Sequence, residues 1–322
     1  MTTIFIVGAP RSGTTWLQSL LAGHPRLASP PELHLFANCF APIERAWKEQ
    51  LERRNRLAAA GFQGGVGLHN ILDETEIIAW MSMLFDRVHR SALAIKPGAT
   101  TLLEKTPSNA FFLPLIRRIV PGAKFIHVVR DPRDAVASLM DVSRRPFGEW
   151  APSTLSSATA VWKDHVLAAL RDSRPEDTTL VRYEDLRTHP YEVLGALAGV
   201  LGLEGPPDAW VLGDHTTPAV QRVVDTSVRR RLPDEPAVST ESAMLPSPFS
   251  SPTLKRLSGS ETWFVESQCA AEMEILGYAI GAFRPGWRNT AGAAAHRARL
   301  AASALWRRTA RLTNRALNSG RH

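Results

Sequence analysis

Residues 4–20 read IFIVGAPRSGTTWLQSL, and this stretch decides the fold of the chain. Its first four residues form a short apolar run, which is typical of a buried parallel strand, and the residues from Thr14 onward predict a helix. A polar loop bounded by Gly8 and Gly13 joins the two, and glycine permits the positive φ angles and close approaches that such a loop needs. Backbone N–H groups and the positive end of the helix dipole then point at one spot, which suits a phosphate or a sulfate.

The loop differs from the nucleotide triphosphate loop at one position. Its spacing is Gly-x-x-x-x-Gly-Thr-Thr, whereas the triphosphate loop has Lys directly after the second glycine. Thr14 stands there and is too short to reach a β- or γ-phosphate, and the positive charge lies inside the loop, on Arg11. The loop therefore predicts a ligand with a 5′-phosphate and a short anionic extension, although an ordinary strand-to-helix turn has the same outline.

A second segment carries another candidate phosphate ligand. Residues 124–140 read KFIHVVRDPRDAVASLM, an apolar strand followed by Arg130 and by a proline-started helix that contains Ser138. A dianionic phosphate is bound well by a fork of donors, which Arg offers. Taken alone, Arg130 with Asp131 and Asp134 could equally form a surface ion-pair cluster.

These two segments together resemble the motifs of sulfotransferases that use 3′-phosphoadenylyl sulfate (PAPS). Residues 10–21, PRSGTTWLQSLL, resemble the 5′-phosphosulfate loop of that family. The cytosolic branch usually has Lys at the position of Arg11, whereas the protein-tyrosine and several bacterial branches have Arg. The resemblance implies an α/β fold, in which helices flank a central parallel β-sheet as in the P-loop nucleoside triphosphate hydrolases.

The resemblance also implies a role for each residue of the two motifs. The loop amides, including that of Gly13, and three hydroxyls would hold the 5′-phosphate; these hydroxyls belong to Ser12, Thr14 and Thr15. Arg11 would offset charge near the transferred sulfuryl group, and Trp16 would stack on the adenine. Arg130 and Ser138 would bind the 3′-phosphate.

A third motif supplies a candidate catalytic cation. Residues 102–107 read LLEKTP, and Lys105 corresponds to the family lysine that contacts the oxygen bridging phosphate and sulfonate. A cation there stabilises the charge that builds on the leaving group as the S–O bond breaks. We expect Glu104 to orient Lys105. The cytosolic branch has a His base two residues after this Lys, where the present chain has Pro107.

A replacement for that base lies earlier in the chain. Residues 31–36, PELHLF, resemble the segment that carries the catalytic glutamate of the heparan sulfate N- and 3-O-sulfotransferases, which assigns the base to Glu32. A carboxylate suits the task, because it accepts a proton only after the acceptor atom has begun to bond to sulfur. His34 is the rival base. His127, within an apolar strand, is expected to be a core residue.

The last family segment is VRYEDLRTHP, residues 181–190. In relatives the Tyr of this segment lies near the adenine, which makes Tyr183 a candidate cofactor ligand. A buried Tyr that only packs in the core explains the same pattern. Further helices are predicted over residues 73–90, 154–170 and 258–277, the last with Gly277 at its C-terminal cap.

Composition sets the frame for these motifs. With 322 residues, of which 44% are hydrophobic, the chain is long enough for one large α/β domain. Its two cysteines form no framework and no metal spacing, so we expect a reducing compartment and no metal. The first strand begins so early that we expect neither signal peptide nor membrane anchor, and hence a cytoplasmic protein.

The net charge of +7 comes from the C-terminal end. Nine arginines lie within residues 284–322, and the rest of the chain carries a net charge of −2. We therefore expect a sulfotransferase domain over residues 1–283, with a mobile Pro/Ser-rich segment at 232–254, and a separate tail over 284–322. This tail could be a basic amphipathic helix that contacts an anionic membrane, or a loosely ordered extension. Arg229–Arg231 are candidates for a basic loop over the cofactor.

The sequence thus predicts transfer of a sulfuryl group from PAPS to a hydroxyl or amine. The expected acceptor is a carbohydrate, a lipid or a specialised metabolite, and no nucleic acid partner is expected; the oligomeric state stays open. One alternative is a P-loop kinase for a small molecule, which the Thr at position 14 disfavours. Another is a non-catalytic nucleotide-binding protein whose tail docks on a membrane, which Glu32 and Lys105 disfavour.

Overall fold

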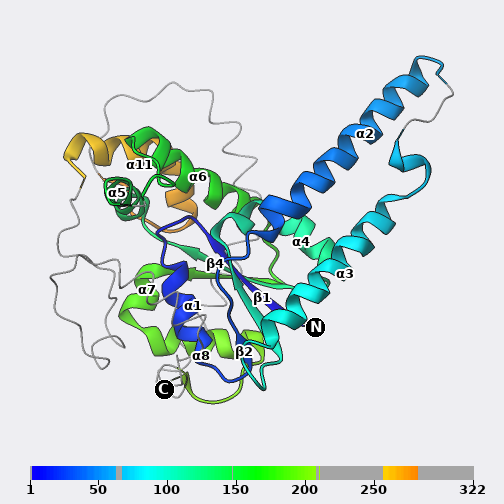
Figure 1. The fold of residues 1–322 in the computed structure, drawn as a ribbon. Coiled ribbons are helices and arrows are strands. Elements are labelled where there is room, and N and C mark those ends of the chain that lie inside the picture. The colour runs from blue at the N-terminus through cyan, green and yellow to red at the C-terminus, as the bar shows by residue number, and fades with distance from the viewer. Residues whose placement is uncertain (1, 63–66, 147, 208–209, 211–256, 282–322) are drawn as a thin grey trace.

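The computed structural model describes residues 2–62, 67–146, 148–207, 210 and 257–281 (Figure 1). The predicted Pro/Ser-rich segment at 232–254, the arginines at 229–231 and the tail at 284–322 lie outside these residues. The predicted domain boundary at residue 283 therefore stays a prediction. Within the described ranges, no helix is both long enough and apolar enough to cross a membrane.

A five-stranded parallel sheet forms the centre of the structure, in the order β2-β3-β1-β4-β5. The strands are β1 (Thr2–Gly8), β2 (Leu27–Ala28), β3 (Thr101–Lys105), β4 (Lys124–Val129) and β5 (Thr178–Arg182). The predicted parallel sheet is confirmed. The edge strand β2 was not predicted, because two residues give no pattern to read.

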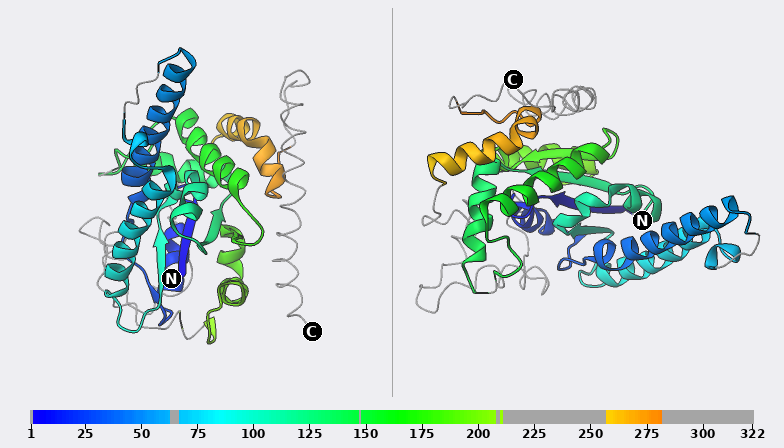
Figure 2. Two further views of the ribbon diagram at one scale, coloured as in Figure 1. Left: turned by 90° about the vertical axis from the view of Figure 1, so that its right-hand side faces the viewer. Right: turned by 90° about the horizontal axis from the view of Figure 1, so that it is seen from above.

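Helices cover the sheet and connect its strands. They are α1 (Thr14–Ala22), α2 (Ala41–Ala59), α3 (Glu74–Leu93), α4 (Leu113–Ile119), α5 (Pro132–Ser143), α6 (Leu155–Asp172), α7 (Tyr183–Thr188), α8 (Pro190–Leu201) and α11 (Gly259–Ile275). Shorter helical turns span Phe36–Phe40, Leu68–Asn70 and Pro107–Phe111. In Figures 1 and 2, α2 and α3 run side by side and project beyond the sheet.

The helices predicted over residues 73–90, 154–170 and 258–277 are present, and each begins at a capping residue. Asp73 and Ser258 each make a capping box at the start of α3 and α11, and Thr154 caps α6. At the end of α11, Gly277 has a φ of 73°, and the amide of Tyr278 donates to the carbonyl of Met273. This Schellman arrangement confirms the predicted glycine stop, with the last helical residue at Ile275.

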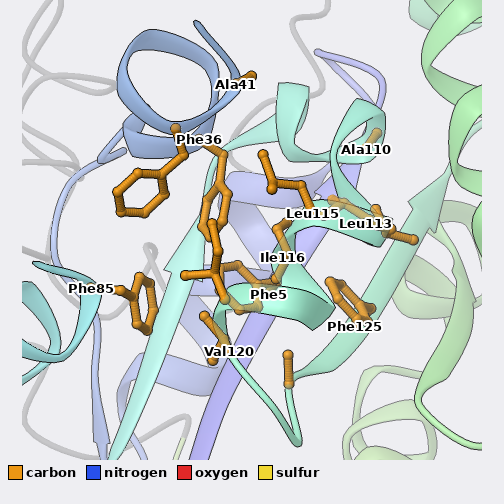
Figure 3. Packing of buried hydrophobic residues seen from close by; sticks show 14 of the residues in the cluster. Phe5, Phe36, Ala41, Phe85, Ala110, Leu113, Leu115, Ile116, Val120 and Phe125 are labelled. Atoms are coloured by element: carbon orange, nitrogen blue, oxygen red, sulfur yellow. The ribbon is translucent and has the colours of Figure 1, made fainter. Parts of the chain in front are cut away.

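The sheet is buried on both faces because the side chains of its central strand alternate. Ile4 and Ile6 of β1 pack with α1, α7 and α8, whereas Phe5 and Val7 pack with α3 and α4. Figure 3 shows the second cluster, in which the Phe5 ring lies 5.7 Å from that of Phe125. A third cluster joins α5, α6 and α11 beside β4.

The parallel strands bring the predicted motifs to one edge. Residue pairing places Lys105 beside Ile6, and Val128 beside Gly8. The carboxyl ends of β3, β1, β4 and β5 therefore lie next to one another, and ligands of such sheets bind beyond that edge. The segment of Glu32 follows β2 and joins this edge on the side of β3.

Candidate active site

The loop between β1 and α1 is possible only because of its two glycines. Gly8 has a φ of 146°, and a Cβ there would lie 2.3 Å from the carbonyl oxygen of Val128. Gly13 has a φ of 94°, and its Cβ would lie 2.4 Å from the Cδ2 atom of Tyr183. The loop therefore packs directly on β4 and on the start of α7, with no room for a side chain at either glycine.

This loop leaves polar hydrogens available to an anion. Gly13 is the N-cap of α1, so no side chain caps the first turn, and the acidic residues common in such turns are absent from it. The Ser12 hydroxyl is buried and has no hydrogen-bond partner among the described residues. Buried polar groups are nearly always paired in proteins, so the unpaired Ser12 hydroxyl and the uncapped amides of this loop are suited to bind an anion.

The first and second motifs meet through Arg11. This residue has a φ of 70°, and its Nε donates a hydrogen bond to Ser138 Oγ at 3.1 Å. Arg130 in turn donates from Nη1 to the carbonyl oxygen of Arg11 at 3.2 Å. Burial, followed by the positive charge of Arg130, lowers the pKa of Arg11 below its ordinary value. Two adjacent guanidinium groups with little solvent around them favour a bound anion.

Arg130 is part of this buried cluster and also makes an ion pair with the exposed Asp134. Its side chain is only 15% exposed, and its distance to Asp134 is 3.9 Å. The guanidinium carbon lies 4.4 Å from the centre of the Tyr183 ring, a cation–π contact. Its buried Nε has no hydrogen-bond partner within the described part of the chain, which leaves a donor for a ligand oxygen.

Tyr183 also contacts the aromatic residue of the first loop. The ring of Trp16 lies edge-on to the Tyr183 ring at 5.8 Å between centres. Tyr183 is 6% exposed, so the alternative of a core tyrosine describes its burial correctly. The same ring nevertheless contacts Gly13, Trp16 and Arg130. The sequence around Tyr183 does not show that these residues surround it.

The turn that presents Arg130 is held by residues that the sequence motifs did not indicate. The indole N–H of the buried Trp162 donates to the Arg130 carbonyl at 3.0 Å. The amide of Asp131 donates to Glu184 at 2.9 Å, and the same carboxylate accepts from the Tyr278 hydroxyl at 2.9 Å. Glu184 belongs to the quoted segment 181–190, but only the fold shows that it faces this turn.

The predicted base and the predicted catalytic lysine form an ion pair. Lys105 is 4% exposed, and its Nζ donates to Glu32 Oε1. The other carboxylate oxygen of Glu32 lies 3.1 Å from His34 Nε2, and the Glu32 side chain is 34% exposed. The carboxylate therefore lies between a buried ammonium and a half-exposed imidazole, and about a third of its side chain is exposed to solvent. The rival base His34 is a neighbour of Glu32.

Two further expectations concern buried titratable groups. Glu104 was expected to orient Lys105, but its hydrogen bonds go to Leu33, Thr106 and Asn109 instead. His127 is fully buried, as expected of a core residue, and burial lowers its pKa to about 3. The described residues hold no group of three or more His, Cys, Asp or Glu arranged for a metal ion.

With this geometry established, comparison with known proteins assigns the family. The sulfotransferase family model matches residues 3–207, and the chain belongs to that family. The match covers β1 to α8 and ends before α11, so Tyr278 lies outside it. Family membership disfavours the kinase alternative.

Curated relatives match only part of their own length. A putative protein-tyrosine sulfotransferase of Caenorhabditis briggsae is 27% identical over 203 residues, which is 62% of this chain and 65% of that protein. The nodulation protein NoeE of Sinorhizobium fredii is 29% identical over 221 residues, covering 62% of this chain and 50% of that protein. Among solved structures, a mouse sulfotransferase complexed with PAP has a TM-score of 0.45 at 14% identity, covering 85% of each chain.

Proposed function

We propose that this protein transfers a sulfuryl group from PAPS to the hydroxyl or amine of an acceptor. The observation that carries the proposal is the Glu32–Lys105 ion pair at the sheet edge where the two basic motifs also meet. A carboxylate able to accept a proton and a buried cation able to offset charge are the two groups that the reaction requires. Family membership supports the same chemistry.

The donor fits the unpaired groups of the site. The loop amides, together with Ser12, Thr14 and Thr15, would bind the 5′-phosphate, and the orphaned Ser12 hydroxyl supports this role. Arg130 and Ser138 would bind the 3′-phosphate, with Arg11 beside them. Trp16 and Tyr183 would contact the adenine.

The reaction then needs few further groups. Bound PAPS supplies the sulfuryl group and a bisphosphate leaving group. Glu32 accepts the proton of the acceptor as the acceptor atom bonds to sulfur, and Lys105 and Arg11 offset the charge on the departing phosphate as its bond to sulfur breaks. The products are the sulfated acceptor and adenosine 3′,5′-bisphosphate, and the proton resides on Glu32 until solvent or His34 removes it.

We further propose a carbohydrate, lipid or specialised metabolite as the acceptor. The segment around Glu32 resembles that of carbohydrate sulfotransferases, and Pro107 occupies the position of the cytosolic branch's histidine. The names of the relatives add tyrosine in a protein as an acceptor class to be tested. A cytoplasmic location and membrane contact through residues 284–322 stay predictions.

Calorimetry separates sulfotransfer from nucleotide kinase chemistry. We expect adenosine 3′,5′-bisphosphate to bind tightly without a divalent metal, because the site offers arginines and amides for two separate phosphates. ATP with Mg²⁺ should bind weakly. Tight binding of ATP–Mg²⁺ with no affinity for the bisphosphate would contradict the proposal.

A screen with PAPS labelled in its sulfuryl group identifies the acceptor. Glycans, glycolipids, small phenols and tyrosine peptides are the classes to compare. Label transfer to the first two classes supports the proposed acceptor, whereas transfer to peptides alone would move the assignment to the protein-tyrosine class.

A further inference from the structure

We infer that Glu104 is a positioning residue: its carboxylate holds the backbone that presents Glu32 and so sets where the base lies. This inference rests on the proposed function, because it takes Glu32 to be the base. It assigns to Glu104 a role toward Glu32 that its place next to Lys105 in the sequence does not suggest.

The strand geometry separates Glu104 from Lys105. Successive side chains of a strand leave on opposite faces of the sheet, so the two residues at the end of β3 point apart. Lys105 reaches Glu32, whereas the Glu104 carboxylate accepts from the amide of Leu33 at 3.3 Å. Leu33 directly follows Glu32. The end of β3 therefore contacts the segment of Glu32 in two ways: Lys105 pairs with the Glu32 side chain, and Glu104 binds the backbone amide of Leu33.

Thr106 links Glu104 to the next backbone amide, that of His34. Its hydroxyl donates to Glu104 Oε1 and accepts from the amide of His34 at 3.4 Å. His34 has a φ of 50°, a backbone conformation that a residue with a side chain adopts only when its surroundings hold it. The amides of Leu33 and His34, the two that follow Glu32, are thus both tied to the Glu104–Thr106 pair.

The burial of Glu104 supports this role. The residue is 2% exposed, and Asn109 Nδ2 donates to its second oxygen at 2.6 Å. Burial raises the pKa of Glu104 to about 7, with the nearby charges of Lys105 and Glu32 acting in opposite directions. A buried carboxylate is costly unless its oxygens are hydrogen-bonded, and here every hydrogen-bond partner fixes the Glu32 segment or the turn after β3.

The substitution Glu104→Gln tests the inference, because it keeps the size of the side chain. The new amide offers one acceptor oxygen where the carboxylate offers two, and its NH2 group cannot accept from the Leu33 amide when it faces that side. We expect kcat to fall by about 10- to 100-fold, as for other displacements of a catalytic group by about 1 Å. The affinity for adenosine 3′,5′-bisphosphate should stay unchanged, since both phosphate motifs lie elsewhere. Hydrogen exchange should accelerate in peptides covering residues 29–36.

Asp177→Asn is the matched control for loss of a partly buried carboxylate. Asp177 pairs with Arg117 at 2.6 Å and directly precedes β5, at the opposite edge of the sheet. This variant should lower stability while kcat and the exchange of residues 29–36 stay as in the wild type. A Glu104→Gln enzyme with wild-type kcat and wild-type exchange in that segment would overturn the inference.

Thr106→Val gives a second test should Glu104→Gln fail to fold. It removes the hydroxyl between His34 and Glu104 and changes no charge, so we expect the same two effects at smaller size. Normal kcat and exchange in this variant would likewise overturn the inference. A wild-type protein that binds no bisphosphate and sulfates no acceptor would refute the proposed function, yet the exchange measurement would still report whether Glu104 holds residues 29–36.

Discussion

Arg11 and Lys105 are the two cations nearest to the predicted chemistry, and the structure gives them different partners. Arg11 donates to Ser138 of the second motif, whereas Lys105 pairs with Glu32. Lys105 is almost fully buried and Arg11 is partly buried, so water screens the charge of each less than it would at the surface. At the residue scale, Lys105 is therefore tied to the candidate base, whereas Arg11 joins the two proposed phosphate motifs.

Substitution of the two cations should separate binding from turnover. We expect Lys105→Ala and Arg11→Ala each to lower turnover by about 10²–10³, the usual effect of losing one transition-state donor. Only Arg11→Ala should also weaken the binding of adenosine 3′,5′-bisphosphate, by about tenfold or more, because it removes a charged donor from the Ser138 side. Calorimetry beside steady-state kinetics makes the comparison; wild-type turnover in either variant removes that residue from the mechanism.

His127 should make the protein less stable in acid. Burial lowers its pKa in the folded state to about 3 from an ordinary value of 6.5. Below about pH 6.5 the unfolded chain therefore binds a proton at His127, whereas the folded chain does not. Because the unfolded state binds more protons, the free energy of unfolding falls as the pH falls.

The variant His127→Leu isolates this effect, because the other buried histidines remain. Between pH 7.5 and pH 5.5 it should lose about 1.4 kcal/mol less stability than the wild type, which corresponds to a tenfold difference in proton binding. Urea unfolding at the two pH values measures the difference. An equal loss in both proteins would show that His127 takes up its proton equally readily in the folded and the unfolded chain.

At the scale of elements, the loop between β1 and α1 depends on contacts with two other segments. Gly8 lies against β4 and Gly13 against the Tyr183 ring at the start of α7. The φ angle alone explains the choice of glycine at both places, but the close packing explains why even a methyl group is too large. The loop is thus shaped by β4 and α7 as much as by its own residues.

The pair Gly13→Ala and Gly122→Ala separates packing from backbone strain. Gly122 has a φ of 81° and open space around its missing Cβ, whereas Gly13 faces Tyr183 at 2.4 Å. Gly122→Ala should cost about 1–2 kcal/mol of stability, the penalty for a left-handed residue with a side chain. Gly13→Ala should cost more and should also abolish bisphosphate binding. Equal effects in urea unfolding and calorimetry would show that Tyr183 moves aside without penalty.

At the scale of the whole molecule, α11 and the residues after it brace the second motif from outside the family match. Tyr278 reaches Glu184, which also holds the amide of Asp131 next to Arg130. Glu266 of α11 binds Arg133 at 2.8 Å, in the first turn of the helix that contains Ser138. Helix α11 and Tyr278 therefore support the turn that carries Arg130.

Tyr278→Phe should weaken that support without touching the ligand. Loss of one hydrogen bond to a carboxylate should lower stability by about 1–3 kcal/mol and bisphosphate affinity by several-fold. Tyr191→Phe is the control, since Tyr191 is 42% exposed and lies on α8. Unfolding and calorimetry report both quantities. Bisphosphate affinity unchanged in Tyr278→Phe would mean that α11 stabilises the fold but does not position Arg130.

The sequence alone determined the parallel sheet, the glycine-bounded loop between β1 and α1, and the placement of four motifs behind apolar strands. These are local properties: an apolar run, a glycine, a capping residue and a proline each act within a few residues of their position. The predicted starts of α3, α6 and α11 agree with the structure for the same reason, because caps are read from adjacent residues.

Only the tertiary structure decided which side chains meet. The pairing of Glu32 with Lys105, of Arg11 with Ser138 and of Glu104 with Leu33 joins residues 73, 127 and 71 positions apart. Such contacts depend on the order of the strands in the sheet and on the face of the sheet from which each side chain projects. Neither property can be predicted from the residues next to one another in the sequence. For that reason the sequence named the candidate residues of the site, whereas the fold showed that Glu104 hydrogen-bonds the segment of Glu32 and that Tyr278 hydrogen-bonds Glu184 beside the turn of Arg130.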